Sequence, residues 1–149
     1  MKTKNIILIL LALFLICPVM HSQKSVDQLF KNFSKEKGVT MIDADMFSVT
    51  FRDFFKITGV KGVEIFSFDE CEQSVRDKLN SEIASLKDDD FETIASINKE
   101  GSRLKFLVRL QGETIKEFVM LKIGEDPSIL RIKGKIKLSD VEKVIKSDK

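Results

Sequence analysis

The hydrophobic pattern of this chain changes its period near Phe91, and this change limits the folds that the chain can adopt. Before Phe91, apolar residues recur at the spacing of amphipathic helices, with short strand-like runs between them. After Phe91, apolar and polar residues alternate, as in strands that have one buried face. This order favours an α+β fold. We therefore expect two layers, in which a mainly antiparallel, four-stranded C-terminal meander packs on helices, with additional short strands from the N-terminal half.

Capping and turn residues set the boundaries of the expected elements. Ser25 is typical of a helix N-cap, and Gly38 of a helix end. Glycine-containing turns at 98–101 and 111–113 separate the later strands. The expected helices are 26–37, 46–57, one that starts at Asp69 or Ser74 and continues to Leu86, and 138–145; the expected strands are 39–42, 60–68, 91–97, 103–110, 114–123 and 129–136.

The first 22 residues have the composition of a secretory signal peptide. Two lysines precede an unbroken apolar run, Ile6–Ile16, which is too short to be a permanent membrane span. We expect cleavage near Ser22 and a single α+β domain over residues 23–149. The protein is then exported, and periplasmic or associated with the cell envelope. Lipid attachment at Cys17 is the less favoured alternative, because a large isoleucine precedes that cysteine.

The residue types that are absent after the leader exclude several kinds of active site. The single histidine, His21, lies in the leader, and the chain has no Trp or Tyr. Without histidine there is no Ser-His-Asp or Cys-His nucleophile and no His-ligated zinc site. Cys71 is the single cysteine after the leader, so no intramolecular disulfide stabilises the domain. We expect no catalytic residue, no cofactor and no metal site.

Cys71 and the acidic residues near it and near Asp88 are candidate sites. A helix start lowers the pKa of a thiol, whereas the carboxylates beside Cys71 raise it, so we expect a packing cysteine. For a calcium loop that begins at Asp88, Thr93 and Lys99 stand where glycine and glutamate are needed, so a solvated turn is expected. A carboxylate-dependent hydrolase is the rival hypothesis, and its candidate acids are Asp43, Asp45, Asp69 and Glu70.

Opposite charges divide the chain at Gly101. Residues 23–100 contain 11 basic and 16 acidic residues, and residues 101–149 contain 12 basic and 7 acidic residues. The leader lysines account for the formal net charge of +2, so the remainder is neutral. A neutral total gives no reason to expect a nucleic-acid partner.

Alternation along the C-terminal strands predicts a basic face of the sheet. The predicted face holds nine cations and a small apolar island. These residues are Arg103, Lys105, Arg109, Lys116, Lys122, Arg131, Lys133, Lys135 and Lys137, with Leu107, Phe118 and Met120 as the island. Such a face fits an anionic protein, a lipid headgroup or a polysaccharide. The alternatives are a solvated face, a face covered by the acidic helices of the first half, and self-association through the apolar island.

Four segments together resemble a known family. They are 25–30 (SVDQLF), 59–65 (GVKGVEI), 69–71 (DEC) and 131–136 (RIKGKI). The chain resembles domain of unknown function 4252 over nearly all of its length after the leader. The resemblance implies a small exported protein of Bacteroidetes-type bacteria with an envelope location and no enzymatic activity. The family has no assigned catalytic or binding residue, so none is transferred to this sequence.

Overall fold

The computed structural model describes residues 24–42 and 59–147. The expected leader, Cys17 and the expected helix 46–57 lie outside this range. Within it the chain forms three helices and six strands. The helices are α2 (Val26–Phe33), α3 (Gln73–Ala84) and α4 (Leu138–Ser147), and the strands are β1 (Thr40–Met41), β2 (Val60–Ser67), β3 (Glu92–Lys99), β4 (Ser102–Gln111), β5 (Thr114–Gly124) and β6 (Ser128–Ile136).

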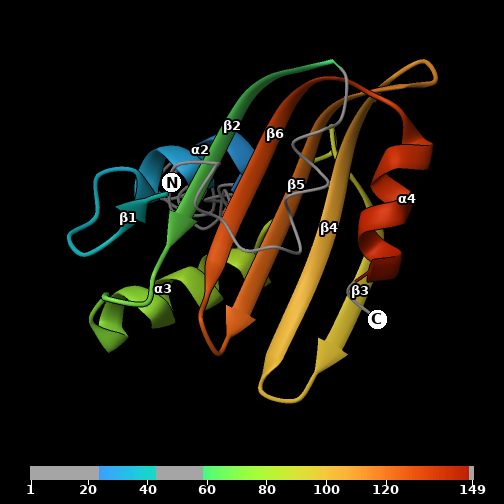
Figure 1. Cartoon of the computed structure of the whole chain (residues 1–149). Coiled ribbons are helices and arrows are strands. Elements are labelled where there is room, and N and C mark those ends of the chain that lie inside the picture. Colours follow the sequence, from blue (N-terminus) through green and yellow to red (C-terminus); the bar gives the residue numbers. More distant parts are fainter. Residues whose placement is uncertain (1–23, 43–58, 148–149) are drawn as a thin grey trace, which may run out of the picture.

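All six strands form one antiparallel sheet in the order β1-β2-β6-β5-β4-β3 (Figure 1). From β3 to β6 each strand lies beside the next one in the chain. β2 comes from the N-terminal half and pairs with β6, with Ile65 opposite Leu130. The fold is therefore α+β, as the sequence predicts, and the N-terminal half extends the sheet at one edge.

Helices pack on both faces of this sheet, whereas two layers were expected (Figure 1). α2 and α3 share one apolar cluster with Val119 and Leu121 of β5, on what we call the α2/α3 face. Val141 of α4 belongs to a second cluster with Phe118 and Met120, on what we call the α4 face. Because β5 is apolar on both sides, both of its faces are buried.

Local sequence explains how α2 begins and which side it buries. The Ser25 hydroxyl accepts a hydrogen bond from the backbone N–H of Gln28 at 3.2 Å, so the predicted N-cap is confirmed. Val26, Leu29, Phe30 and Phe33 lie on the buried side at helical spacing. Burial of each of these side chains contributes about 1.5–3 kcal/mol.

The next helix, α3, begins at Gln73, between the two expected starts, Asp69 and Ser74. Its N-cap is Glu72, which makes no side-chain capping bond, and Leu79 and Ile83 are its buried apolar residues. None of the helices in residues 24–42 and 59–147 has the length and hydrophobicity that a bilayer crossing requires.

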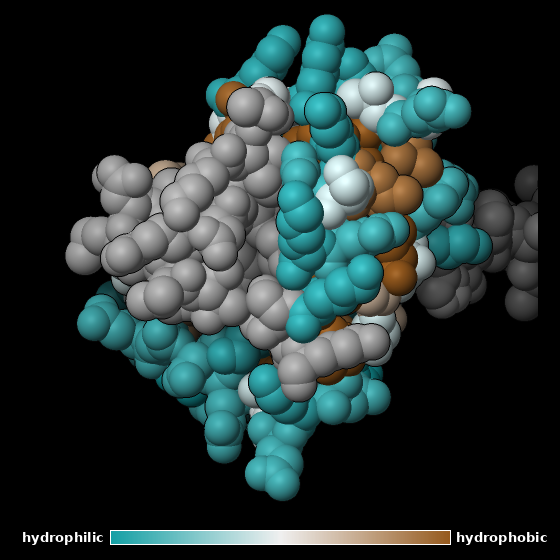
Figure 2. Space-filling view, turned by 45° about the vertical axis from the view of Figure 1, so that its right-hand side comes forward, coloured by the Kyte–Doolittle hydropathy of each residue, from teal (hydrophilic) through white to brown (hydrophobic). Residues whose placement is uncertain are grey.

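One end of the sheet, the upper end in Figure 1, brings together four segments that are distant in the sequence. They are the start of β2, the turn from β4 into β5, the end of β6 and the start of α4. Their positions follow from the strand register, in which Val60 lies opposite Gly134 and Ile115 lies opposite both Leu110 and Ile136. Hydrophilic side chains project from this end, and hydrophobic atoms are visible between and below them (Figure 2).

Gly124 provides a test of the sheet geometry. Its φ is +100°, and an added Cβ would lie 2.0 Å from the carbonyl oxygen of Gly101. We predict that Gly124→Ala lowers the free energy of unfolding by about 2 kcal/mol or more, because backbone strain and a backbone clash add up. Urea denaturation measures this loss. Gly62→Ala is the matched control, since nothing lies within 4 Å of its added Cβ, and an equal loss in both variants would contradict the geometry.

Candidate functional site

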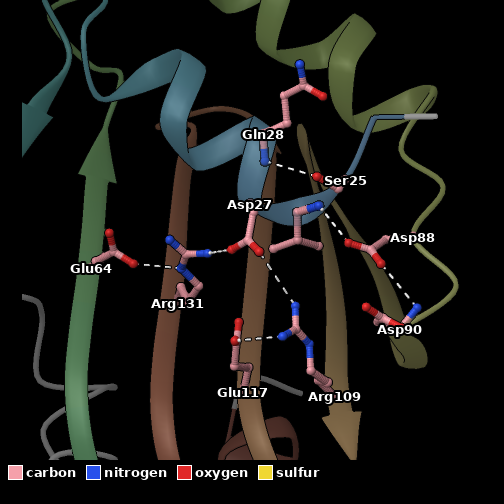
Figure 3. A network of polar contacts seen from close by, with 10 residues as sticks. Ser25, Asp27, Gln28, Glu64, Asp88, Asp90, Arg109, Glu117 and Arg131 are labelled. Carbon is pink, nitrogen blue, oxygen red and sulfur yellow. Dashed lines mark hydrogen bonds and ion pairs between the residues drawn. The ribbon is translucent and has the colours of Figure 1, made fainter. Parts of the chain in front are cut away.

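A cluster of ion pairs lies where the first turn of α2 crosses the sheet (Figure 3). At its centre is Arg131 of β6, whose residue is only 6% exposed. Its Nη1 pairs with Asp27 of α2, and its Nε donates to Glu64 Oε2 of β2 at 2.6 Å. The guanidinium also lies over the ring of Phe30, 4.3 Å from the centroid. One side chain thus joins a helix and two strands.

Arg109 of β4 extends the cluster on the same face of the sheet. Its Nη1 lies 3.3 Å from Glu117 Oε1 on β5, and its Nη2 lies 3.8 Å from the second carboxylate oxygen of Asp27 (Figure 3). Its guanidinium also stacks over Phe91 at 4.8 Å. Asp27 therefore receives both arginines, in the first turn of a helix where the dipole favours a negative charge.

The Asp88–Asp90 segment also contacts the first residue of α2. One oxygen of Asp88 accepts the backbone N–H of Val26 at 2.9 Å, and the other accepts the N–H of Asp90 at 3.1 Å (Figure 3). This segment therefore anchors α2 and shapes its own turn. Among the described residues, no three potential metal ligands converge.

The ion pairs of Arg109 and Arg131 attach α2 to the sheet. Each carboxylate faces a cation from another element, and α2 is held on the sheet by charge as well as by apolar contacts. The two arginines make these contacts inside the molecule. The hypothesis that acidic helices of the first half cover the basic face is therefore supported for this part of the sheet.

The predicted basic face divides among separate places in the structure. Arg103, Lys105 and Arg109 do lie on one face with Leu107, as the alternation predicted, because Leu107 pairs with Val119 of the α2/α3 cluster. α2 and α3 pack on that face, and Leu107 is buried. The prediction of a single open face is wrong, because helices of the N-terminal half occupy its centre.

Arg103 and Lys105 line a small groove between α3 and the sheet. Its volume is about 160 Å³, and Ile83 and Leu121 contribute to its walls. Arg103 Nε donates to Asn98 Oδ1 of the neighbouring strand at 3.2 Å. These two cations are thus separated by Leu107 from the Arg109 end of their strand.

Phe118 and Met120 lie on the α4 face and are 0% and 1% exposed, so their assignment to the basic face is wrong. Lys122 lies on that same face, opposite Leu104. The error has a physical cause, because β5 is apolar on both sides and its alternation gives no sign of which side carries the cations. Self-association through the apolar island is also contradicted, because all three of its side chains are core residues.

The remaining predicted cations gather at the upper end of the sheet. Together with Lys61, which the alternation of the C-terminal strands does not predict, they form what we call the lysine tip. Four of the five are exposed, and Lys116 is half-buried at a bulge of β5. Within the described residues, none of the five forms an ion pair. The lysine tip consists of Lys61, Lys116, Lys133, Lys135 and Lys137.

Two leucines at the same end were also missed as surface residues. Leu110 is 43% exposed at the end of β4, and Leu138 is 49% exposed at the start of α4. The other large apolar side chain exposed in the described part is Met41, on β1 beside the opposite end of β2. The turn after Leu110 was a usable signal, since it places the end of β4 beside the start of β5 and hence the end of β6.

Cys71 is 8% exposed and belongs to the α2/α3 cluster, which confirms the expected packing role. Burial raises the pKa of its thiol; Arg76 opposes this shift, and the nearby carboxylates of Glu36, Asp69 and Glu70 add to it. Asp69 accepts a hydrogen bond from the Ser67 hydroxyl at 2.8 Å. Both Asp69 and Glu70 are exposed, and the other two candidate acids, Asp43 and Asp45, lie outside the described residues.

Removal of the central guanidinium tests the ion-pair cluster. We predict that Arg131→Met lowers the free energy of unfolding by about 2–3 kcal/mol, because it leaves Glu64 without its cation and Asp27 with the more distant Arg109 alone. The loss is smaller than for a fully buried pair, since side-chain exposures of 38% and 63% allow water to solvate these acids. Chemical denaturation measures the change. Lys133→Met, on the same strand face, is expected to change stability by less than about 0.5 kcal/mol; an equal effect would refute the structural role of Arg131.

Alkylation tests the environment of Cys71. Because folding raises the pKa of this thiol, less thiolate is present near neutral pH and the native protein reacts slowly with iodoacetamide. We expect a rate at least about tenfold higher in urea, and a native pH–rate profile displaced to higher pH. Mass spectrometry measures the rate, and Cys71→Ser reports any labelling at Cys17. A native rate equal to the unfolded rate would show that the thiol is accessible.

Comparison with known proteins agrees with the sequence resemblance. No curated protein and no solved structure is significantly similar to the chain. The model of one family, described as a domain of unknown function (DUF4252), matches residues 23–144. This match includes the elements that build the ion-pair cluster and the lysine tip, and the chain belongs to the DUF4252 family.

Proposed function

We propose that the protein is an exported, non-catalytic domain that binds an anionic partner in the cell envelope through the lysine tip. The observation that carries this proposal is that the arginines and the lysines of the sheet make different contacts. Arg109 and Arg131 form internal ion pairs, whereas the lysines of the tip form no ion pair with a described residue. Cations that no internal partner uses are available to an external anion.

The content of the chain supports a binding role over a catalytic one. It has no histidine after residue 21. The described carboxylates of the ion-pair cluster face arginines, and the Cys71 thiol is buried with a raised pKa. No observation favours the carboxylate-dependent hydrolase, since Asp69 and Glu70 are exposed on a turn and Asp69 is bonded to its neighbour Ser67.

The location is part of the proposal. The charged start and apolar run of the first 22 residues support export, with cleavage near Ser22. The processed protein then faces the periplasm or the envelope, where anionic headgroups, phosphorylated polysaccharides and acidic proteins are all accessible. Lipid attachment at Cys17 would place the same domain on a membrane surface.

Salt-dependent capture from envelope extracts tests this function. We predict that the exported protein retains an envelope component at low salt and releases it in about 1 M salt, where the Debye length falls to about 3 Å. Lys133→Glu/Lys135→Glu, which reverses two charges of the tip, is expected to lower capture at least about tenfold.

The control variant is Lys31→Glu/Lys35→Glu, which reverses two exposed charges on and after α2 and is expected to retain full capture. Circular dichroism verifies that both variants are folded. Capture that is insensitive to salt and unchanged by the tip variant would refute the proposal. An equal loss in both variants would show that total charge, and not the tip, determines binding.

A further inference from the structure

Resting on the proposed function, we infer that its anionic partner is the headgroup region of a lipid membrane, on which the protein docks with the lysine tip and with Leu110 and Leu138. Two independent observations meet at one end of the molecule. One is the group of lysines that form no ion pair within the described part of the chain, and the other is the pair of exposed leucines. Lysines that surround exposed apolar side chains are typical of surfaces that lie in a membrane interface.

The charge around the tip favours contact with phosphates. The acidic residues of the same end are Glu113, in the turn between β4 and β5, Glu117 of β5, opposite Lys133, and Asp140, in the first turn of α4. Glu117 is buried and pairs with Arg109 at 3.3 Å. Asp140 lies 3.6 Å from Lys143 on its own helix. Only Glu113 is therefore left opposite five lysines in this described part of the chain. Lysines at an anionic membrane surface contribute about 1 kcal/mol each, which is about fivefold in affinity.

Leu110 and Leu138 add an apolar contact that the lysines alone do not provide. Leu110 lies near the end of β4 and Leu138 begins α4. These ends of β4 and α4 both lie at the upper end of the sheet (Figure 1). Met41 is more exposed, at 65%, but it lies on β1 beside the opposite end of β2. The exposed leucines and the unpaired lysines therefore occupy the same end. An apolar side chain that enters the interface leaves water, which strengthens binding to lipid and not to a free polyanion.

The identity of the cations separates a membrane from a protein partner. Protein interfaces are enriched in arginine and depleted in lysine. In this chain, Arg131 and Arg109 are engaged under α2, and the tip contains lysines alone. An ammonium group on a flexible stem acts as a point charge and suits phosphates whose positions vary, as they do in a fluid bilayer.

Vesicle co-sedimentation of the exported protein tests the inference. We expect binding to phosphatidylglycerol-rich vesicles at low salt and little binding to phosphatidylcholine vesicles. Lys133→Gln/Lys135→Gln should weaken binding about thirtyfold, and Leu110→Ser/Leu138→Ser about tenfold. The matched controls, Lys31→Gln/Lys35→Gln and Met41→Ser, should bind as the unchanged protein does. All variants share one N-terminus, so any contribution from the leader or a lipid anchor is constant.

A fluorescence measurement makes the test independent of the serine variants. The chain contains no tryptophan, so Leu138→Trp introduces a single reporter at the tip and Met41→Trp a single reporter at the other end of the sheet. We expect the emission of Leu138→Trp to shift to the blue with phosphatidylglycerol vesicles, and to be quenched by brominated lipid. The emission of Met41→Trp should remain unchanged.

Each result has a definite meaning. Equal binding to both kinds of vesicle, binding that the leucine changes leave intact, or an unshifted Leu138→Trp emission would overturn the membrane inference. Absence of vesicle binding, with lysine-dependent capture from envelope extracts retained, would also overturn it while the proposed function stands, and would identify a protein or polysaccharide as the partner. Loss of both vesicle binding and extract capture would overturn both proposals.

Discussion

The buried guanidinium of Arg131 joins the two halves of this chain. It lies between Asp27 of α2 and Glu64 of β2, both from the acidic half, and it extends from β6 in the basic half. A cation that is 6% exposed is stable only when nearby acids compensate its desolvation. The opposite charges of the two halves are therefore partly neutralised where α2 meets the sheet, and the ring of Phe30 completes the enclosure of the guanidinium.

This internal pairing also determines which charges remain outside. α2 reaches the middle of the sheet, where Arg131 and Arg109 meet Asp27, and the strands continue beyond it to the upper end (Figures 1 and 3). Arginine suits the enclosed positions, since its planar group pairs with carboxylates and stacks on rings, as it does on Phe30 and Phe91. Lysines occupy the upper end, where they form no ion pair with a described acid. Stability and the proposed binding surface thus depend on different cations of the same sheet.

The sequence predicted the elements better than their arrangement. Helix spacing, the Ser25 cap and the glycine turns located the described helices and strands to within a few residues, since these signals are local. The basic face was harder to predict, because it depends on strand register and on what covers the sheet. β5 shows the limit: with Phe118 and Met120 on one side and Val119 and Leu121 on the other, its composition does not distinguish the two faces.

The candidate site was likewise only partly predictable from the sequence. By itself the sequence determined the α+β class, the absence of histidine chemistry after residue 21, the packing role of Cys71 and the opposite charges of the two halves, because composition and periodicity are properties of the chain. The tertiary structure alone decided that Arg131 is enclosed under α2 and that Lys61 lies at the same end as the late lysines. These facts depend on antiparallel pairing between β2 and β6, and long-range pairing brings together residues whose relation no local pattern records.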